Sequence, residues 1–351
     1  MLQFIVNRLF YGFLVIIGVI TVVFGLFHAL PGDPVDLMSG QHADLETRDL
    51  IRKELGLDEP LIVQYGNYLS DLSVISVEKD TEKNQKKYRY TKLIPLGDHA
   101  LVFKFPYLRR SFQTNKPVDE ILIESLPGTF WLSLAAIIIA SSLGIFLGVV
   151  AALNYGTKID HIIVSSSVVF ISMPSFVLAI LMAMIFGYYL SEYTGLPMTG
   201  SLWMNDPIYG RQLHLENLIL PAITLATRPL AIIVQLTRSS MLDVMSQDYV
   251  RTAKAKGVGR IRVIIVHTLR NALNPVITAV SGWLASMLAG AFFIEYIFKW
   301  KGLGFKTIQA VEYLDLPVVM GATIFIAFGF VVVNIFVDII YATLDPKIRL
   351  N

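Results

Sequence analysis

The 351-residue sequence contains no cysteine. Disulfides, thiolate nucleophiles and cysteine-based metal sites are therefore excluded, and cysteine usage gives no information about the redox compartment. Charged residues are also scarce, at 16% of the chain, whereas a soluble protein carries about 25%. Because 54% of the residues are hydrophobic and many lie in long runs, this shortage favours an integral membrane protein. The net charge of +2 gives no reason to expect a nucleic-acid partner.

The sequence also lacks the short motifs of common enzymes. The phosphate-binding pattern G-x-x-x-x-G-K-[ST] is absent, and its nearest approach is KGLGFKT, where Phe305 separates Gly304 from Lys306. The backbone amides of that motif must surround the phosphates at a fixed spacing, so we interpret this stretch as a glycine-rich turn. Neither H-E-x-x-H nor G-x-S-x-G occurs, and the six histidines are scattered. We therefore predict that the chain is not an enzyme and that it holds no metal or cofactor.

Six apolar stretches are long enough to cross a bilayer as helices, which takes about 20 residues. The first is interpreted as a retained membrane helix, because a signal peptide has a shorter apolar core and a small-residue cleavage site. Pro174 and Pro229 lie inside two of the stretches and predict kinks. The predicted fold is an all-α integral membrane protein with six transmembrane helices. The stretches are residues 9–29, 130–153, 162–190, 218–236, 276–298 and 318–344.

The distribution of lysine and arginine predicts the orientation in the membrane. Residues 238–275 carry Arg238, Arg251, Lys254, Lys256, Arg260, Arg262 and Arg270. Only Asp243 and Asp248 oppose them. Short loops rich in lysine and arginine stay in the cytoplasm, so this loop and, with six spans, both termini are predicted to be cytoplasmic. We predict a multi-pass protein of the cell (inner or cytoplasmic) membrane, embedded in the lipid bilayer.

The predicted parts are an N-terminal transmembrane helix (1–30), an extracytoplasmic segment (31–129) and a membrane core (130–351) that contains the loop 238–275. A segment as long as the extracytoplasmic one is translocated regardless of its charge. Within it, LGLDEPLIVQYGNYL has the pattern of an amphipathic helix, and HALVFKFPYL has that of a strand. These patterns predict a small extracytoplasmic subdomain.

Several polar residues fall within the predicted spans. Placing the charge of Arg228 in the lipid costs several kcal/mol of free energy, so its side chain is predicted to face protein or a water-filled cavity. In one interpretation it lines a translocation pathway, and in the other it forms a structural ion pair or reaches the interface. Asn334 and Asp338 lie four residues apart, where they bond across helices or lie near the interface. Glu295, near the end of the fifth span, is open to an interfacial interpretation.

The stretch YVRTAKAKGVGR lies between the fourth and fifth predicted spans. Residues 248–256 are good helix formers with a basic C-terminal end, and Gly257 is placed to end that helix in a left-handed conformation. A second helix, RIRVIIVHTLRNAL, is predicted to begin about three residues later and to end before Pro275. The result is a short cytoplasmic helix, a glycine turn and a helix that leads into the fifth span.

The first of these helices carries a small apolar face with basic flanks. Tyr249, Val250 and Ala253 share that face through their three- and four-residue spacing. Such a face suits docking into a groove of another protein. Binding to anionic lipid head groups is the alternative.

The stretch DYVRTAKAKGVGRIRVIIVHTLRNALNPVIT resembles the cytoplasmic loop of the permease subunits of binding-protein-dependent ABC importers. Within that family it is most similar to the dipeptide, oligopeptide and nickel branch. Further stretches agree in the same order along the chain, namely LPGDP, LGLDEPLIVQY, PVDEILIESLPGTFWLSLAA, RSSMLDVMSQDYVRTAKAKG, FIEYIFKWKGLG and DLPVVMGATIFIAFGFVVVNIFVDIIYATLDPKIR. The agreement spans both ends and most of the middle, and it is specific for the family but not for the cargo.

The resemblance implies the six-helix fold of ABC importer permeases and a permease subunit that translocates short peptides. The partners it implies are a homologous second permease subunit, two ATPase subunits that bind ATP and Mg, and an extracytoplasmic substrate-binding protein. Nickel chelates or another small solute are alternative cargoes, and an ion-coupled secondary transporter is the alternative from a different class. The residues implied to dock on the ATPase are Tyr249, Val250, Arg251, Thr252, Ala253, Lys254, Ala255, Lys256 and Gly257.

The sequence departs from the family pattern in two places. Arg251, Thr252 and Ala253 stand where the general family loop reads Glu-Ala-Ala, so the acidic contact to the ATPase is missing. Residues 74–104 replace a shorter link and are interpreted as an insertion. Contacts of that link with a substrate-binding protein are therefore not carried over.

Overall fold

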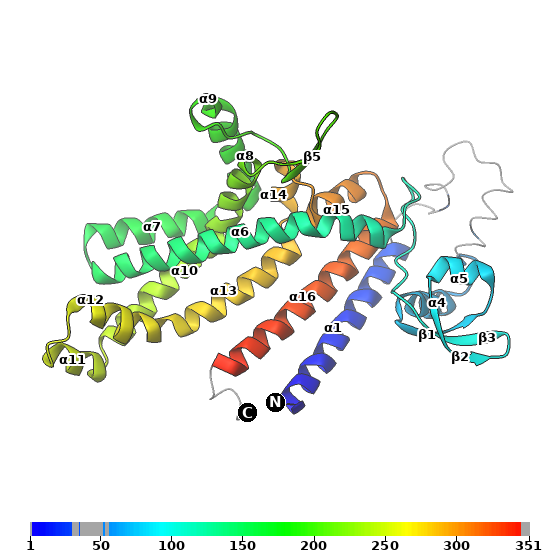
Figure 1. Ribbon diagram of the computed structural model, residues 1–351, viewed down its shortest axis with the longest axis horizontal. Helices are drawn as coiled ribbons and strands as arrows, with labels where there is room; N and C mark the ends of the chain where they lie inside the picture. The colour runs from blue at the N-terminus through cyan, green and yellow to red at the C-terminus, as the bar shows by residue number, and fades with distance from the viewer. Residues whose placement is uncertain (1, 30–34, 36–51, 53–55, 345–351) are drawn as a thin grey trace. The chain divides into compact units, whose positions relative to one another are not determined.

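The computed structural model describes residues 2–29, 35, 52 and 56–344. The chain divides into two compact units. Unit 1 contains residues 1–9, 125–308 and 328–351, and unit 2 contains residues 10–124 and 309–327. The helices that contribute residues to both units are α1 (Leu2–Ala29), α6 (Val118–Leu153), α15 (Leu303–Glu312) and α16 (Leu316–Leu344). All elements are labelled as in Figure 1.

Unit 1 is almost entirely helical. Its other elements are α7 (Lys158–Ser172), α8 (Ser175–Met184), the π-helical η1 (Ile185–Tyr189), α9 (Ser191–Thr194), the hairpin β4 (Trp203–Asp206) and β5 (Gly210–Leu213), α10 (Glu216–Met245), α11 (Asp248–Ala255), α12 (Arg260–Arg262), the π-helical η2 (Val263–Leu269), α13 (Arg270–Gly290) and α14 (Phe292–Ile297).

Helix α10 forms the centre of unit 1 and packs against α6, α7 and α13. Gly144 and Gly148 of α6 allow its backbone to approach α10 closely. A Cβ atom on Gly144 would lie 2.8 Å from Ile233 Cγ2, and one on Gly148 would lie 2.5 Å from Thr237 Cβ and 2.8 Å from the Val234 carbonyl oxygen. Small residues four apart are a common device for packing membrane helices. They fix the position of α10, which carries Arg228.

The third predicted span is broken. Residues 158–172 and 175–189 meet at an angle of 105°, much sharper than the kink predicted at Pro174. Proline has no N–H to donate and forces the preceding residue out of the helical conformation. Met173 accordingly has φ −76° and ψ 131°. Pro229, in contrast, lies inside the uninterrupted α10.

The fifth predicted span begins earlier than the hydropathy suggested. Elements α12, η2 and α13 follow one another without a gap from Arg260 to Gly290. The prediction that a cytoplasmic helix ends before Pro275 is therefore wrong, because Pro275 lies inside α13. The predicted end of this span at Phe298 is also wrong, since α14 is a separate short helix that starts at Phe292.

Helix α14 places the side chain of Glu295 in a fully buried position inside the protein. Its carboxylate accepts hydrogen bonds from Thr129 Oγ1 at 2.6 Å and from the Phe305 amide at 3.0 Å. The missing side chain of Gly302 makes room for it, because a Cβ atom there would lie 2.4 Å from Glu295 Oε2. Glu295 thus joins α6 to the first turn of α15 within unit 1.

Among the residues that the structure describes, five helices are long and apolar enough to cross a membrane, and the bent pair raises the number to six if it counts as one span. The predicted membrane protein of mainly helical fold is confirmed, with these changes of boundary. The five helical segments are Val6–Ala29, Val118–Leu153, Glu216–Met245, Arg260–Leu288 and Leu316–Val337.

Unit 2 contains the subdomain predicted after the first span. A helix, α4 (Leu61–Leu72), precedes β1 (Ile75–Lys79), α5 (Glu82–Tyr88), β2 (Thr91–Leu96) and β3 (His99–Phe103), and the strands form an antiparallel sheet in the order β1-β3-β2. The predicted amphipathic helix and strand are both present, although α4 begins only at Leu61. The sheet shows that the fold is not purely α-helical.

Candidate functional site

Helix α11 and the turn that follows it form the cytoplasmic element predicted from the sequence. Gly257 has a φ of +75°, which favours glycine. The Gly257 amide donates to the Lys254 carbonyl at 3.0 Å, and the Val258 amide donates to the Ala253 carbonyl at 3.2 Å. This pair of hydrogen bonds is a Schellman cap, and Val258 packs against Ala253 as such caps usually require. The predicted helix end at Gly257 is confirmed.

The apolar face of α11 lies against the chain itself. Val250 is fully buried and Ala253 is 8% exposed, both in contact with Val263 of η2. The prediction that Val250 and Ala253 point toward a partner is therefore wrong. Tyr249 is 45% exposed, and its hydroxyl accepts a hydrogen bond from Asn271 Nδ2 at 3.1 Å. The apolar face instead fastens α11 to the helix that enters the membrane.

The exposed surface of α11 and its turn is polar and basic. Arg251, Thr252, Lys254, Ala255 and Lys256 are all exposed, as is Gly257. Asp248 lies 3.6 Å from Arg251, but both side chains are largely in solvent, so this pair contributes little to stability. The chain continues with Arg260 and Arg262, also exposed. A partner that binds here meets positive charge.

The connection from α11 to the membrane passes through a π-helical segment, η2. Thr268 Oγ1 donates to the Val263 carbonyl, five residues earlier, at 3.1 Å. Ala272 at the start of α13 packs with Met241 of α10 and Ala152 of α6. One end of each of these three long helices therefore joins a common cluster next to α11.

A buried ion pair joins α7 to α10 near the same end. Arg238 Nε and Nη2 donate to the two carboxylate oxygens of Asp160 at 2.6 and 2.7 Å. The Gly156 amide donates to the same carboxylate at 3.0 Å. Arg238 was counted among the basic residues of the predicted loop 238–275. It lies instead within α10, which extends to Met245, and its charge is paired with Asp160. Asp160 was not predicted as a buried residue, because the sequence around it resembles that of any exposed acidic residue in the first turn of a helix.

Arg228 lies in the middle of α10, a helix long and apolar enough to cross a membrane, and its side chain is exposed. It has no hydrogen-bond or ion-pair partner among the described residues, so the interpretation as an ion pair within this chain finds no support there. The neighbouring α13 carries Asn274, Thr278 and Ser286 at exposed positions, separated by multiples of four residues. Exposed polar groups on membrane helices mark surfaces that face water or another protein.

Asn334 and Asp338, the other polar residues predicted within spans, give no evidence of a site in the described residues. Asn334 Nδ2 donates to the Phe330 carbonyl of its own helix at 2.8 Å, so the hydrogen bond across helices is not observed. The side chain of Asp338 lies outside the described residues. Within the described ranges, no group of three or more His, Cys, Asp or Glu residues is arranged to hold a metal ion.

Two family models together match almost the whole chain. The model described as "Binding-protein-dependent transport system inner membrane component" matches residues 144–350, and the model of the corresponding N-terminal region matches residues 1–135. The chain belongs to this family of inner membrane transport components. The predicted resemblance to ABC importer permeases is thereby confirmed. Residues 249–257 and Arg228 all lie within the matched region 144–350.

This permease is similar over almost its full length to several curated relatives. It is 35% identical to the dipeptide transport system permease protein of Escherichia coli K12 over 99% of both chains. It is 34% identical to the dipeptide transport system permease protein of Alkalihalophilus pseudofirmus, over 99% of this chain and 100% of the relative. It is 38% identical to a putative peptide transport system permease protein of Brucella abortus, over 99% of both chains.

Among solved structures, the permease is similar to a chain of the MetNI methionine ABC transporter in inward-facing conformations. The match has a TM-score of 0.50 and 13% sequence identity, and it covers 65% of this chain and 97% of the other. At this identity the similarity concerns the fold alone.

Proposed function

We propose that this permease translocates short peptides through the membrane as part of an ATP-driven importer. The observation that carries the proposal is similarity to dipeptide and peptide permeases over 99% of the chain. We also propose that it assembles with a homologous second permease subunit, two ATPase subunits and an extracytoplasmic substrate-binding protein. Uptake of radiolabelled dipeptides by vesicles containing the assembled transporter tests the cargo. Uptake of nickel or another solute in place of dipeptides would contradict it.

The docking surface is the exposed side of α11 and its turn, Tyr249 to Gly257. Because Val250 and Ala253 hold α11 against η2, the ATPase contacts Arg251, Thr252, Lys254, Ala255 and Lys256. Charge complementarity then requires acidic side chains in the groove of the ATPase. Acidic side chains of the ATPase would then replace the ion pair that the general family loop makes with its own acidic residue, where this chain has Arg251.

The absence of cysteine makes this surface directly testable. A single cysteine at Ala255, which is exposed, should crosslink to cysteines placed along the ATPase groove in the assembled complex. A cysteine at Ala253, which is 8% exposed, is a matched control two residues away and should crosslink much less. Equal crosslinking at both positions, or none at Ala255 in an assembled complex, would contradict the docking geometry.

Arg228 is proposed to line the translocation pathway, where its guanidinium pairs with the carboxylate of a passing peptide. Its exposed position on a membrane helix and the lack of a partner among the described residues support this role. The Arg228→Gln variant should take up peptides with a free C-terminus more slowly and C-terminally amidated peptides at an unchanged rate. The Arg228→Lys variant should retain most of the discrimination, because it keeps the charge. A loss that is equal for both kinds of peptide would indicate a structural role.

The proposed orientation places both termini and the α11 turn in the cytoplasm. It rests on the basic residues near α11, since short basic loops remain inside. A single cysteine at Lys256 should react with a membrane-impermeant maleimide only in inside-out vesicles. A cysteine at Tyr209, in the turn between β4 and β5, should react only in right-side-out vesicles. The reverse pattern would overturn the orientation.

A further inference from the structure

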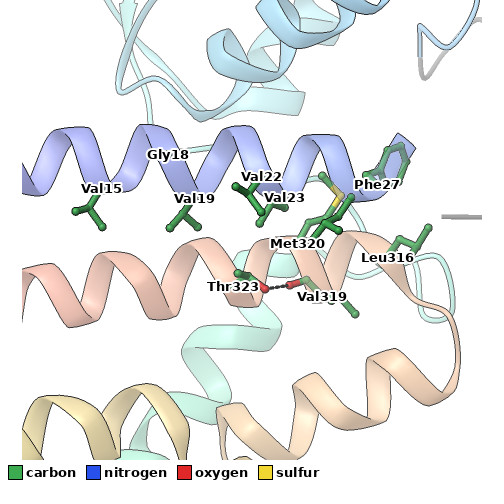
Figure 2. Close-up of a pocket in the computed structure, with 11 residues that line it drawn as sticks. Val15, Gly18, Val19, Val22, Val23, Phe27, Leu316, Val319, Met320 and Thr323 are labelled. Atoms are coloured by element: carbon green, nitrogen blue, oxygen red, sulfur yellow. Dashed lines mark hydrogen bonds between the residues drawn. The ribbon is translucent and has the colours of Figure 1, made fainter. Parts of the chain in front are cut away.

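We propose that unit 2 contains a phospholipid-binding site, with an acyl chain in the groove between α1 and α16 and the lipid phosphate on Arg109. The groove has a volume of about 500 Å³ and lies entirely within this unit. Figure 2 shows side chains of α1, among them Val19 and Val22, directed toward α16. The site does not depend on the proposed transport function.

The lining of the groove is suited to a hydrocarbon chain. Val19, Val22 and Phe27 line it from α1, and Met320 lines it from α16. Thr323 supplies the one side-chain hydroxyl of the lining, and that group already donates to the Val319 carbonyl of its own helix at 2.8 Å. Water is unstable in an apolar cavity without polar partners, and the groove opens along two membrane-length helices. Lipid acyl chains are therefore the natural occupant.

Gly18 shapes the wall of the groove. A Cβ atom added to it would meet nothing within 4 Å, so the space beside this residue is open. Gly25, two turns later in the same helix, is equally open but does not line the groove. A larger side chain at Gly18 should therefore fill the groove without disturbing the packing of either helix.

The segment that contains Arg109 contacts both α1 and α16 beside the groove. Leu108 packs on α16, where its Cβ is 3.5 Å from the position that a Cβ on Gly321 would occupy. The Arg109 guanidinium lies over the ring of Phe27, whose centroid is 6.0 Å away. Arg109 thus places a positive charge next to Phe27, an α1 side chain that lines the groove.

The charge of Arg109 is not neutralised by any described residue. It is half-buried and lies 5.5 Å from the centroid of the Tyr68 ring. Burial raises the pKa of the Tyr68 hydroxyl above its usual value, so this ring is neutral at pH 7. None of the described carboxylates lies within ion-pair distance of the guanidinium. A phosphate diester is the anion that a bilayer presents at the end of an acyl chain, and arginine binds phosphate in a bidentate manner.

Photolabelling tests the proposal on the full chain. The protein is reconstituted into vesicles of phosphatidylethanolamine and phosphatidylglycerol that contain a phosphatidylglycerol with a diazirine in its acyl chain, and adducts are mapped by mass spectrometry. We expect adducts on residues 15–27 and 316–323. Gly18→Leu should reduce them by about tenfold or more, and Gly25→Leu should leave them unchanged. Arg109→Gln should also reduce them by about tenfold or more, as expected when the hydrogen bonds of the guanidinium to the phosphate are lost.

A matched control separates the charge of Arg109 from general attraction to the membrane. Arg110 is the next residue and is exposed, with its guanidinium donating to the Asn115 carbonyl at 2.7 Å. Arg110→Gln should label like the wild type. Equal labelling of the Gly18→Leu and Gly25→Leu variants would overturn the acyl site, and equal labelling of the two arginine variants would overturn the phosphate site. If a photocrosslinker at Val22 captures another protein chain and no lipid, the groove is a helix interface instead.

Discussion

Replacing Asp160 with asparagine should destabilise the protein by about 3 kcal/mol. Removal of one member of a buried ion pair costs about 3–5 kcal/mol, because the remaining charge is left unpaired in a poorly solvated site. The side chain of Asp160 is 3% exposed and that of Arg238 is 23% exposed. The arginine left behind regains some hydration, and this places the expected loss at the lower end of the range.

A double-mutant cycle separates the pair from its surroundings. Arg238→Gln alone should cost a similar amount, since the buried Asp160 carboxylate then keeps only the Gly156 amide. The double variant pairs two neutral amides and should be about 2 kcal/mol more stable than the sum of the single losses predicts. Thermal unfolding in detergent at one scan rate, followed by the fluorescence of the four tryptophans, measures the three variants. A coupling within about 0.5 kcal/mol of zero would refute the buried pair.

Three further substitutions test other parts of the structure. Gly148→Ala places a methyl group 2.5 Å from Thr237 Cβ, so it should cost about 1–3 kcal/mol through overpacking and lower the unfolding temperature. Lys104→Met removes a buried ammonium 2.6 Å from Glu78 Oε1, which should cost about 3 kcal/mol and make residues 75–103 of the intact chain more sensitive to protease. Val250→Asp buries a charge at a fully enclosed position, so amide exchange of residues 248–255 should accelerate strongly.

Hydropathy predicted the membrane helices well because their length is set by the bilayer and not by tertiary contacts. It failed where backbone conformation matters more than apolar content. The run of residues 162–190 is predominantly apolar and carries no charge, yet Met173 adopts an extended conformation before Pro174 and the helix bends by 105°. At Pro275 the same local rule predicted a helix end that does not occur, because α13 tolerates a proline in its interior.

The helix that carries the candidate site was predicted from the sequence, but the element that covers its apolar face was not. Helical spacing placed Val250 and Ala253 on one face, and they do share one. A spacing pattern of this kind indicates that a helix face is apolar, but it does not indicate whether the chain itself or a partner covers that face. Glu295 illustrates a second limit, since its partners Thr129 and Gly302 are identified only by the folded structure. Thr129 lies 166 residues away in the sequence, and no local pattern points to such a contact.

The unbroken helix from Arg260 to Gly290 bears on how docking can move the membrane region. A helix end before Pro275, as the sequence predicted, would separate the helix next to α11 from the fifth span. The structure has no break in this helix, and 31 residues at about 1.5 Å each give a rod of about 45 Å. Since Val250 and Ala253 pack on η2 and the Tyr249 hydroxyl is bonded to Asn271, a displacement of α11 must tilt the whole rod or break these contacts. Short π-helical segments inside α-helices are frequent at functional sites, so we expect η2 to change conformation first when the two ends of this helix are driven apart.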